Sequence, residues 1–193
     1  MRRRLRDAAL ELYGEHGFDR TTAAEVAARA GFTERTYFRH FADKREVVFD
    51  GEAALREAMT DAVASAPDLP PLGVLRAAFL SVASGAEEDR ERQVHQHRVI
   101  SSAPDLQERA ATKAASITRA VAEALERRGV PRGLASLAAA CGGEVLQRAR
   151  QEWLAGSPDS LAVLVATGFA DLDLLLHGGD AHDGPPTAPG TSA

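Results

Sequence analysis

The chain has 193 residues, of which 45% are hydrophobic and 26% are charged, and its net charge is −5. These values are typical of a globular protein with a buried core, and they exclude a collagen-like chain, a coiled-coil rod, a multidomain enzyme and wholesale disorder. The single cysteine, Cys141, excludes an intramolecular disulfide framework and any multi-cysteine metal site, which favours the reducing cytoplasm. No apolar run approaches the ~20 residues of a membrane span, and acidic residues follow the basic start where a signal peptide has its apolar core.

The charge is unevenly distributed along the chain. Residues 1–48 hold 10 Lys/Arg and 8 Asp/Glu, a net charge of +2, whereas the remaining residues hold 13 and 20, a net charge of −7. Four of the cations stand at the very start, Arg2, Arg3, Arg4 and Arg6. This asymmetry predicts an acidic body that carries a small head for an anionic partner.

The periodicity of the apolar residues predicts an all-α protein of about nine helices, because strand patterns are almost absent. The first helix is expected over 2–16, with an apolar stripe formed by Leu5, Ala9, Leu12 and Tyr13. Thr22 can cap a second short helix that ends at Gly31, and Thr33 a third over 34–41. Asp43 can cap a fourth, expected to run unbroken from Lys44 to about Ser65.

Proline, glycine and serine divide the rest of the chain. Three prolines within residues 64–73 cannot lie inside a helix, so a second body begins there. Further breaks predict helices near 72–84, 87–101, 105–128, 132–155 and 159–177. The last segment is rich in Gly and Pro and is expected to be disordered. The predicted organisation is a head of residues 1–48, a body of residues 49–177 and a tail of residues 178–193.

The second and third helices meet the physical requirements of a helix-turn-helix. Ala27 and Ala30 are small enough for the helices to cross, and Gly31 tolerates the positive φ of the turn. Tyr37 and Phe41, four residues apart, can anchor the third helix in a core. Its polar residues then face solvent or a nucleic-acid duplex.

The segment AALELYGEHGFDRTTAAEVAARAGFTERTYFRHFADK, residues 8–44, resembles the N-terminal domain of the tetracycline-repressor (TetR) family of bacterial transcriptional regulators. The residues that carry the resemblance are Gly17, Thr22, Gly31, Thr36, His40, Phe41 and Lys44. The resemblance implies a homodimer whose acidic, all-helical bodies associate through their last two helices. It also implies a small-molecule pocket in each body and two heads placed in successive major grooves of double-stranded DNA.

The resemblance also implies roles for individual residues of the head. Thr22, Thr36, His40 and Lys44 are similar in position to contacts with the phosphate backbone. Arginines of the third helix can pair with guanine, and its glutamate can accept from cytosine. The expected DNA-binding set is Thr22, Thr33, Glu34, Arg35, Thr36, Phe38, Arg39, His40 and Lys44.

Two features of the head leave alternatives open. Phe38 stands where the family most often has Tyr, so it lacks the hydroxyl that donates to a phosphate and can instead pack against a sugar or a thymine methyl. The N-terminal arginines are either an ordinary basic terminus or a segment that follows the DNA backbone or enters a minor groove. The alternative for the charged side of the third helix is that it contacts only solvent, as the charged face of a short helix usually does.

The body carries weaker signals. Its layout is similar to that of other regulators of the family, which implies an apolar or acyl-type effector. The residues expected to bind it are Phe79, Val94, His97, Arg98, Ile117, Val121, Gln147 and Trp153, although such residues also serve simply as core. His95 and His97 point to opposite sides of a helix, so no metal site is expected, and Cys141 is expected to be a buried, inert thiol. No catalytic cluster or cofactor motif is present, so an enzyme is not expected.

Each of the last two helices has a face too apolar to remain exposed to water. Pairing of these two helices with their copies in a second chain would form a four-helix dimer interface. Its expected residues are Leu134, Cys141, Val145, Leu161, Val165, Gly168 and Leu172. We therefore expect a repressor that binds a palindromic operator as a homodimer and is released by a small apolar effector, with the fourth helix as a rigid lever. The alternatives are an enzyme with a vestigial head, which needs an acid–base cluster, and an architectural DNA binder, which needs a basic body.

Overall fold

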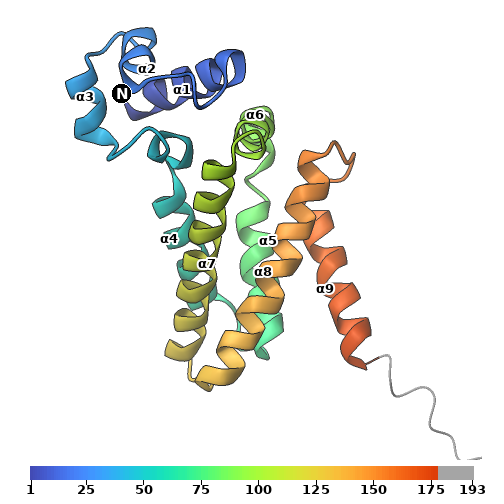
Figure 1. Cartoon of the computed structure of the whole chain (residues 1–193). Coiled ribbons are helices and arrows are strands. Elements are labelled where there is room, and N and C mark those ends of the chain that lie inside the picture. Colours follow the sequence, from blue (N-terminus) through green and yellow to red (C-terminus); the bar gives the residue numbers. More distant parts are fainter. Residues whose placement is uncertain (178–193) are drawn as a thin grey trace, which may run out of the picture.

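The computed structural model describes residues 1–177, and within them the chain forms nine α-helices, two short 3₁₀ helices and no β-strand (Figure 1). The predicted all-α class is therefore confirmed. The segment expected to be disordered, residues 178–193, lies outside the described residues. None of the described helices is long and apolar enough to cross a membrane.

The first three helices, α1 (Arg2–His16), α2 (Ala23–Arg29) and α3 (Glu34–His40), form a small head at one end of the molecule (Figure 1). Their bounds agree with the prediction to within one residue, because each begins and ends at a capping residue or a glycine. The predicted stripe of α1 is buried in the core of the head, as are Val26, Tyr37 and Phe41. Three residues of the body complete this core: Val99, Ala103 and Leu106.

The predicted fourth helix is broken, which corrects the expectation of one rigid rod from Lys44 to Ser65. A 3₁₀ helix, η1 (Glu46–Phe49), is followed by a turn, and only then does α4 (Glu52–Ser65) begin. Val47 and Val48, adjacent in sequence, are both fully buried in the head core. The chain then turns at Gly51, whose φ of 105° disfavours every residue with a side chain. The break at Gly51 thus separates the head from α4.

The body consists of α4 and five further helices, whose bounds agree closely with the predicted breaks. They are α5 (Pro71–Ala83), α6 (Arg90–Ser101), α7 (Pro104–Arg127), α8 (Arg132–Leu154) and α9 (Leu161–His177). A short 3₁₀ helix, η2 (Glu87–Asp89), occupies the start of the segment predicted as one helix from residue 87.

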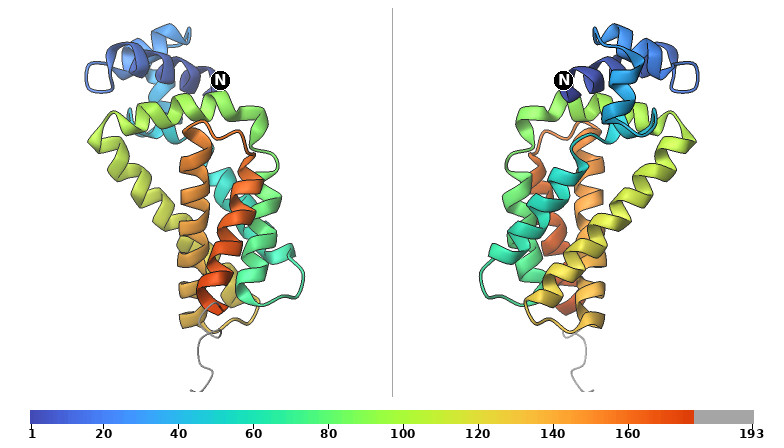
Figure 2. Two further views of the ribbon diagram at one scale, coloured as in Figure 1. Left: turned by 90° about the vertical axis from the view of Figure 1, so that its right-hand side faces the viewer. Right: turned by 90° about the vertical axis from the view of Figure 1, so that its left-hand side faces the viewer.

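Helix α6 lies across the upper end of the body, directly beneath the head (Figure 2). Helices α7 and α8 meet at the lower end and diverge toward α6 (Figures 1 and 2). The core of the body is centred on Leu75, Phe79, Trp153 and Phe169, which are almost completely buried. Two apolar cores therefore exist, one in the head and one in the body, and α6 lies between them.

Candidate nucleic-acid interface and effector region

Reciprocal hydrogen bonds hold the start of α2. The Thr22 hydroxyl accepts from the backbone N–H of Glu25 at 3.2 Å, and the Glu25 carboxylate accepts from the Thr22 backbone N–H at 2.7 Å. This capping box satisfies backbone donors that a helix start otherwise leaves free. The backbone hydrogen bond from Thr22 is the largest influence that lowers the pKa of Glu25. Thr22 itself is exposed at the outer edge of the head.

A tight turn connects α2 to α3. Gly31 has a φ of 78°, and the backbone N–H of Phe32 donates to the carbonyl of Ala27 at 2.8 Å. The Thr33 hydroxyl then accepts from the backbone N–H of Thr36 at 3.2 Å and caps α3. The turn and both caps predicted from sequence are present.

Helix α3 is anchored on one side and open on the other. Tyr37 and Phe41 are buried, with ring centroids 5.5 Å apart. Burial raises the pKa of Tyr37 above its ordinary value, and its hydroxyl donates to the carbonyl of Asp43 at 3.4 Å. The outward side of the helix exposes Glu34, Arg35, Phe38 and Arg39, whereas Thr36 and His40 are half-buried.

Phe38 is half-exposed although it is a large apolar residue, with 50% of its surface accessible. Its ring meets Tyr37 edge-on at 5.4 Å between centroids. Among the residues that the structure describes, the side chains of Glu34 and Arg35 make no hydrogen bond or ion pair. The outward side of α3 is therefore an ordered surface whose polar groups are available to a partner.

The N-terminal arginines belong to α1 and fasten it to the ends of the other two helices of the head. Arg2 donates to the carbonyl of His40 at 2.9 Å, pairs with Asp50 at 2.6 Å and lies over the Phe41 ring. Arg4 donates to the carbonyl of Ala30 at 2.8 Å. Cations at helix carboxyl ends are favoured by the exposed carbonyls and the helix dipole. These two arginines thus have a structural role that the sequence pattern did not indicate.

Lys44 is held by the loop between α1 and α2. Its ammonium donates to the carbonyl of Phe18 at 3.1 Å and lies 4.1 Å from the centre of the Phe18 ring. The hydroxyl of Tyr13, whose pKa burial raises, donates to the carbonyl of Lys44 at 2.7 Å. Lys44 therefore contributes to the integrity of the head in addition to any contact with a phosphate.

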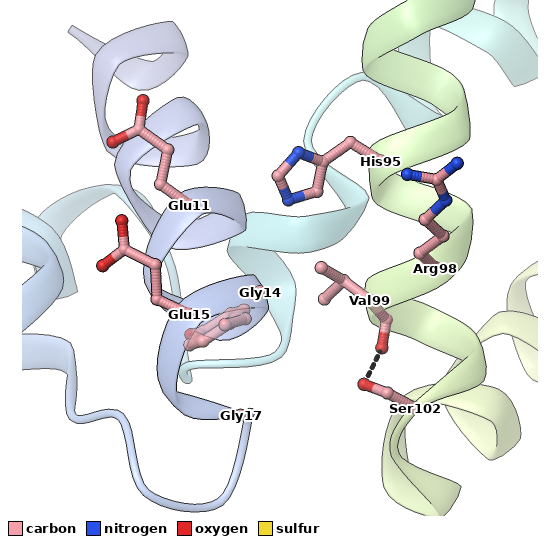
Figure 3. Close-up of a pocket in the computed structure, with 9 residues that line it drawn as sticks. Glu11, Gly14, Glu15, Gly17, His95, Arg98, Val99 and Ser102 are labelled. Atoms are coloured by element: carbon pink, nitrogen blue, oxygen red, sulfur yellow. Dashed lines mark hydrogen bonds between the residues drawn. The ribbon is translucent and has the colours of Figure 1, made fainter.

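Two consecutive side chains of α6 hold the head to the body. Nε2 of His95 lies 3.0 Å from the carbonyl oxygen of Leu10 in α1, and Gln96 donates to the carbonyl of Val48 at 2.6 Å. Beside them lies a cleft of about 550 Å³ between α1 and α6 (Figure 3). Its lining residues are Glu11, Tyr13, Gly14, Glu15, Gly17, His95, Arg98, Val99 and Ser102.

A cluster of charges joins α7 to both sides of the Gly51 break. Lys113 donates to Glu46 of η1 at 3.2 Å and to Glu52 of α4 at 2.5 Å, and Arg109 donates to Glu46 at 2.7 Å. Lys113 is only 15% exposed, so water screens this cluster less than an ordinary surface pair. We call these four residues the α7 clamp.

The residues expected to bind an effector divide into two groups. Phe79, Val121 and Trp153 are buried, and Val94 and Ile117 are partly buried against the same core. The indole N–H of Trp153 donates to Glu87 at 2.8 Å. His97, Arg98 and Gln147, which were expected to provide polar contacts to an effector, are exposed at the surface of the body. Arg98 lines the cleft beneath the head instead.

The structure indicates one polar residue of the body that the sequence pattern did not single out. Arg150 of α8 is half-buried, and burial lowers its pKa. Its side chain makes no hydrogen bond or ion pair with any residue in the described range 1–177. In the sequence it stands in an Arg-rich stretch of an amphipathic helix, and only the tertiary packing distinguishes it from its exposed neighbours.

The residues expected at a dimer interface fall into two groups, those buried within the chain and those that remain exposed or half-buried. Leu161 and Val165 are buried in the chain's own core. Gly168 lies against Val145 of the same chain, where an added Cβ would stand 2.8 Å from Val145 Cγ1. Leu134 is exposed, and Cys141 and Leu172 are half-buried. The exposed apolar residues of these two helices are Leu134, Leu137, Val163, Leu174, Leu175 and Leu176.

Two family models match the chain. Residues 5–50 match the model described as bacterial regulatory proteins, tetR family, and residues 69–176 match the model described as the MftR C-terminal domain. The first covers the head with η1, and the second covers more than half of the chain.

Individual relatives agree with these matches. A protein of Mycobacterium tuberculosis named as a mycofactocin biosynthesis transcriptional regulator, MftR, is 31% identical over 63% of this chain, and the match spans 62% of that relative's length. The HTH-type transcriptional regulator TcmR of Streptomyces glaucescens is 38% identical over 42% of this chain and 38% of its own length. These relatives are regulators, in agreement with the prediction that the chain is not an enzyme.

A solved structure of the family matches over nearly the whole chain. The TetR family repressor FadR of Thermus thermophilus, in complex with lauroyl-CoA, is 28% identical and superimposes with a TM-score of 0.58. The match covers 99% of this chain and 100% of that one.

Proposed function

The chain belongs to the TetR family of bacterial regulatory proteins, and from this premise we propose that it is a homodimeric repressor released from a palindromic operator by a small apolar effector. In this proposal residues 1–48 bind DNA, and residues 49–177 bind the effector and form the dimer. The observation that carries it is the outward side of α3, where the exposed side chains of Glu34 and Arg35, which make no hydrogen bond or ion pair within the described residues, accompany an exposed aromatic ring, that of Phe38.

Helix α3 enters the major groove in this proposal. Glu34, Arg35 and Arg39 are exposed on the side opposite the buried anchors, so they can reach base edges. The residues expected near the phosphates are Thr22, Thr33, Thr36, His40 and Lys44, which lie at the ends of α2 and α3 or next to them. Phe38 stands among them and can pack against a sugar or a thymine methyl.

The apolar side of α8 and α9 pairs with a second copy. Leu137 and Leu175 are 62% and 81% exposed, and the other exposed apolar residues of these helices extend the same surface. Pairing removes this surface from water, which is the dominant favourable contribution to most protein association. It also fixes the separation of the two heads, which must be ~34–36 Å to reach consecutive major grooves.

The effector binds within the body in this proposal, between α6, α7 and α8. The apolar residues expected there, Val94, Ile117 and Val121, share one core with Trp153. The FadR relative is a complex with lauroyl-CoA, which supports an acyl or otherwise apolar effector for this chain.

Coupling between effector and head runs through α6 and α7 rather than along α4 alone. The Gly51 break interrupts the rod that was expected to act as a lever, whereas His95, Gln96 and the α7 clamp bind the head directly. An effector that binds one arrangement of α6 and α7 more tightly shifts the spacing of the heads. Tenfold release requires only about 1.4 kcal/mol of that preference.

The test is footprinting of the purified protein on DNA upstream of its own coding region, followed by a salt titration on the protected site. We expect a protected palindrome and an affinity that falls steeply with salt, since phosphate contacts release counterions. The exposed body residue Arg127 changed to Ala serves as the control, and it should bind like the wild type. Equal affinity for the protected site and for random DNA would exclude a sequence-specific repressor.

A further inference from the structure

Phe38 lies on one flank of α3, and the residue one turn before it on the same flank is Glu34. The two are four residues apart, so their side chains stand on nearly the same side of the helix. Both are exposed, and the side chain of Glu34 makes no hydrogen bond or ion pair within residues 1–177. Single exposed apolar side chains are common on protein surfaces, so the role of Phe38 depends on the groups around it and not on its exposure.

The opposite flank of α3 has a different chemistry. Thr36 and His40 are also four residues apart, and His40 is two residues from Phe38, so the two flanks are about 160° apart around the helix axis. Nε2 of His40 lies 2.9 Å from Sδ of Met1, and Arg2 donates to the carbonyl of His40 at 2.9 Å. The start of α1, with its exposed arginines, therefore borders the flank of Thr36 and His40.

This difference in charge suits the two flanks to different parts of a duplex. A phosphate is attracted by the hydroxyl, the imidazole and the neighbouring cations on the flank of Thr36 and His40. On the other flank, the carboxylate of Glu34 repels a phosphate, and the ring of Phe38 has no donor to offer one. A carboxylate accepts instead from the exocyclic amino group of a base. The flank of Glu34 and Phe38 is therefore suited to base edges and not to the backbone.

One group on the base edges of the major groove is apolar, the 5-methyl group of thymine. The side chain of Phe38 has no polar atom, so contact with any other base-edge group would remove a donor or an acceptor from water without a hydrogen bond. Contact with a methyl group has no such cost, because it removes apolar surface of both partners from water. Among the groups in the groove, the thymine methyl is therefore the one that matches this ring.

We propose that Phe38 reads the 5-methyl group of a thymine in each operator half-site, and that it thereby contributes to the choice of sequence and not to contact with the DNA backbone. This inference rests on the proposed function, and it specifies one chemical feature of the operator. Burial of one methyl group corresponds to about a fourfold gain in affinity.

The test begins with selection of binding sites from random double-stranded DNA by the full-length protein. Each thymine of the selected half-site is then replaced in turn by deoxyuridine, which lacks the methyl group and keeps every hydrogen-bonding group. Fluorescence anisotropy gives the Kd of each duplex. We expect one position per half-site at which loss of the methyl weakens the wild type about fourfold, and about 15-fold when both half-sites are substituted.

Phe38→Ala assigns this effect to the ring. It should bind the thymine and deoxyuridine duplexes equally, whereas Phe38→Leu, which keeps an apolar side chain, should still prefer thymine. Leu69→Ala, at an exposed leucine between α4 and α5, is the control and should behave like the wild type. Because the comparison is a double-mutant cycle between ring and methyl, a general effect of deoxyuridine on the duplex cancels.

The inference is overturned if no thymine methyl of the selected site affects the affinity of the wild type, a result that requires no variant. It is also overturned if Phe38→Ala keeps the full preference for thymine. An equal loss of affinity for Phe38→Ala on selected and random DNA, without a methyl effect, would assign the ring to the sugar–phosphate backbone instead.

The selection itself separates this inference from the proposed function. A selected sequence that binds without dependence on any thymine methyl leaves the repressor proposal standing and removes the role of Phe38. Selection that enriches no sequence excludes a sequence-specific repressor, and the inference about Phe38 fails with it.

Discussion

The head and the body of this protein use the same secondary structure in opposite ways. In the head, short capped helices are fixed by a tight aromatic core, and the polar residues of α3 face outward. In the body, long helices form a larger core, yet Val94, Ile117 and Leu146 at its edge remain partly exposed. The head therefore presents polar residues on a helix that its core anchors. The core of the body, in contrast, has partly exposed apolar residues at its edge.

The junction explains how two such different regions act together. Val99, Ala103 and Leu106 of the body complete the head core, and the α7 clamp reaches across the Gly51 break. A change in the arrangement of α6 or α7 therefore acts on the head directly. The following predictions test how separate the two regions are, in order of expected effect.

The largest effect is expected from separation of the two copies. Leu174→Glu combined with Leu175→Glu should produce monomers, because these exposed residues have no role in the chain's own core. Operator affinity should fall about 10²–10⁴-fold, since one head alone binds one half-site. Analytical ultracentrifugation and operator titration measure both effects. Leu69→Glu, an exposed leucine between α4 and α5, is the control, and an intact dimer in the double variant would exclude this interface.

The second prediction compares the two cores. Tyr37→Ala should destabilise the head by about 3–5 kcal/mol, and Phe79→Ala should destabilise the body by a similar amount. We expect hydrogen exchange to accelerate in α1–α3 for the first variant and in α5, α8 and α9 for the second. If Tyr37→Ala accelerated exchange throughout the body as well, the shared residues at the junction would make head and body one cooperative unit.

The third prediction separates base contacts from backbone contacts within the head. Arg35→Ala should cost about 1–3 kcal/mol on the operator and relax the preference at one base pair. Lys44→Met should weaken binding to all DNA and reduce the salt slope by about one for each phosphate that it no longer neutralises. Anisotropy titrations on operator and random DNA at several salt concentrations distinguish these outcomes. An equal fall in affinity on both DNAs for both variants would contradict these roles.

The smallest effect is expected at the α7 clamp. Lys113→Met leaves Glu46 and Glu52 without their shared partner and should lower the free energy of unfolding by about 1–2 kcal/mol. A double-mutant cycle of Lys113→Met with Glu46→Gln measures, by chemical denaturation, the coupling between α7 and η1 on the head side of the Gly51 break. Additive changes in the cycle would show that the clamp does not join α7 to η1. Arg119→Gln is the control for loss of a charge from α7.

Much of the architecture could be predicted because its signals are local. Thr22, Thr33, Gly31 and the proline segment at 64–73 act through their own backbone, so the helix bounds agree with the structure. The continuous fourth helix was wrong because its pattern of apolar residues fits a helix, whereas burial of both Val47 and Val48 requires a turn at Gly51. The roles of Arg2 and Arg4 were missed because their acceptors, the carbonyls of His40 and Ala30, lie on other helices.

Local signals along the chain were sufficient to predict the all-α class, the helix-turn-helix and the residues on the outward side of α3, since caps, turns and helical periodicity depend on neighbours within a few positions. Which apolar residues of α8 and α9 remain exposed follows instead from packing between helices, because Leu161 and Leu175 have equivalent side chains and packing buries only Leu161. Packing also leaves His97, Arg98 and Gln147 exposed and Arg150 half-buried. Burial depends on helices distant in sequence, and no local pattern encodes it.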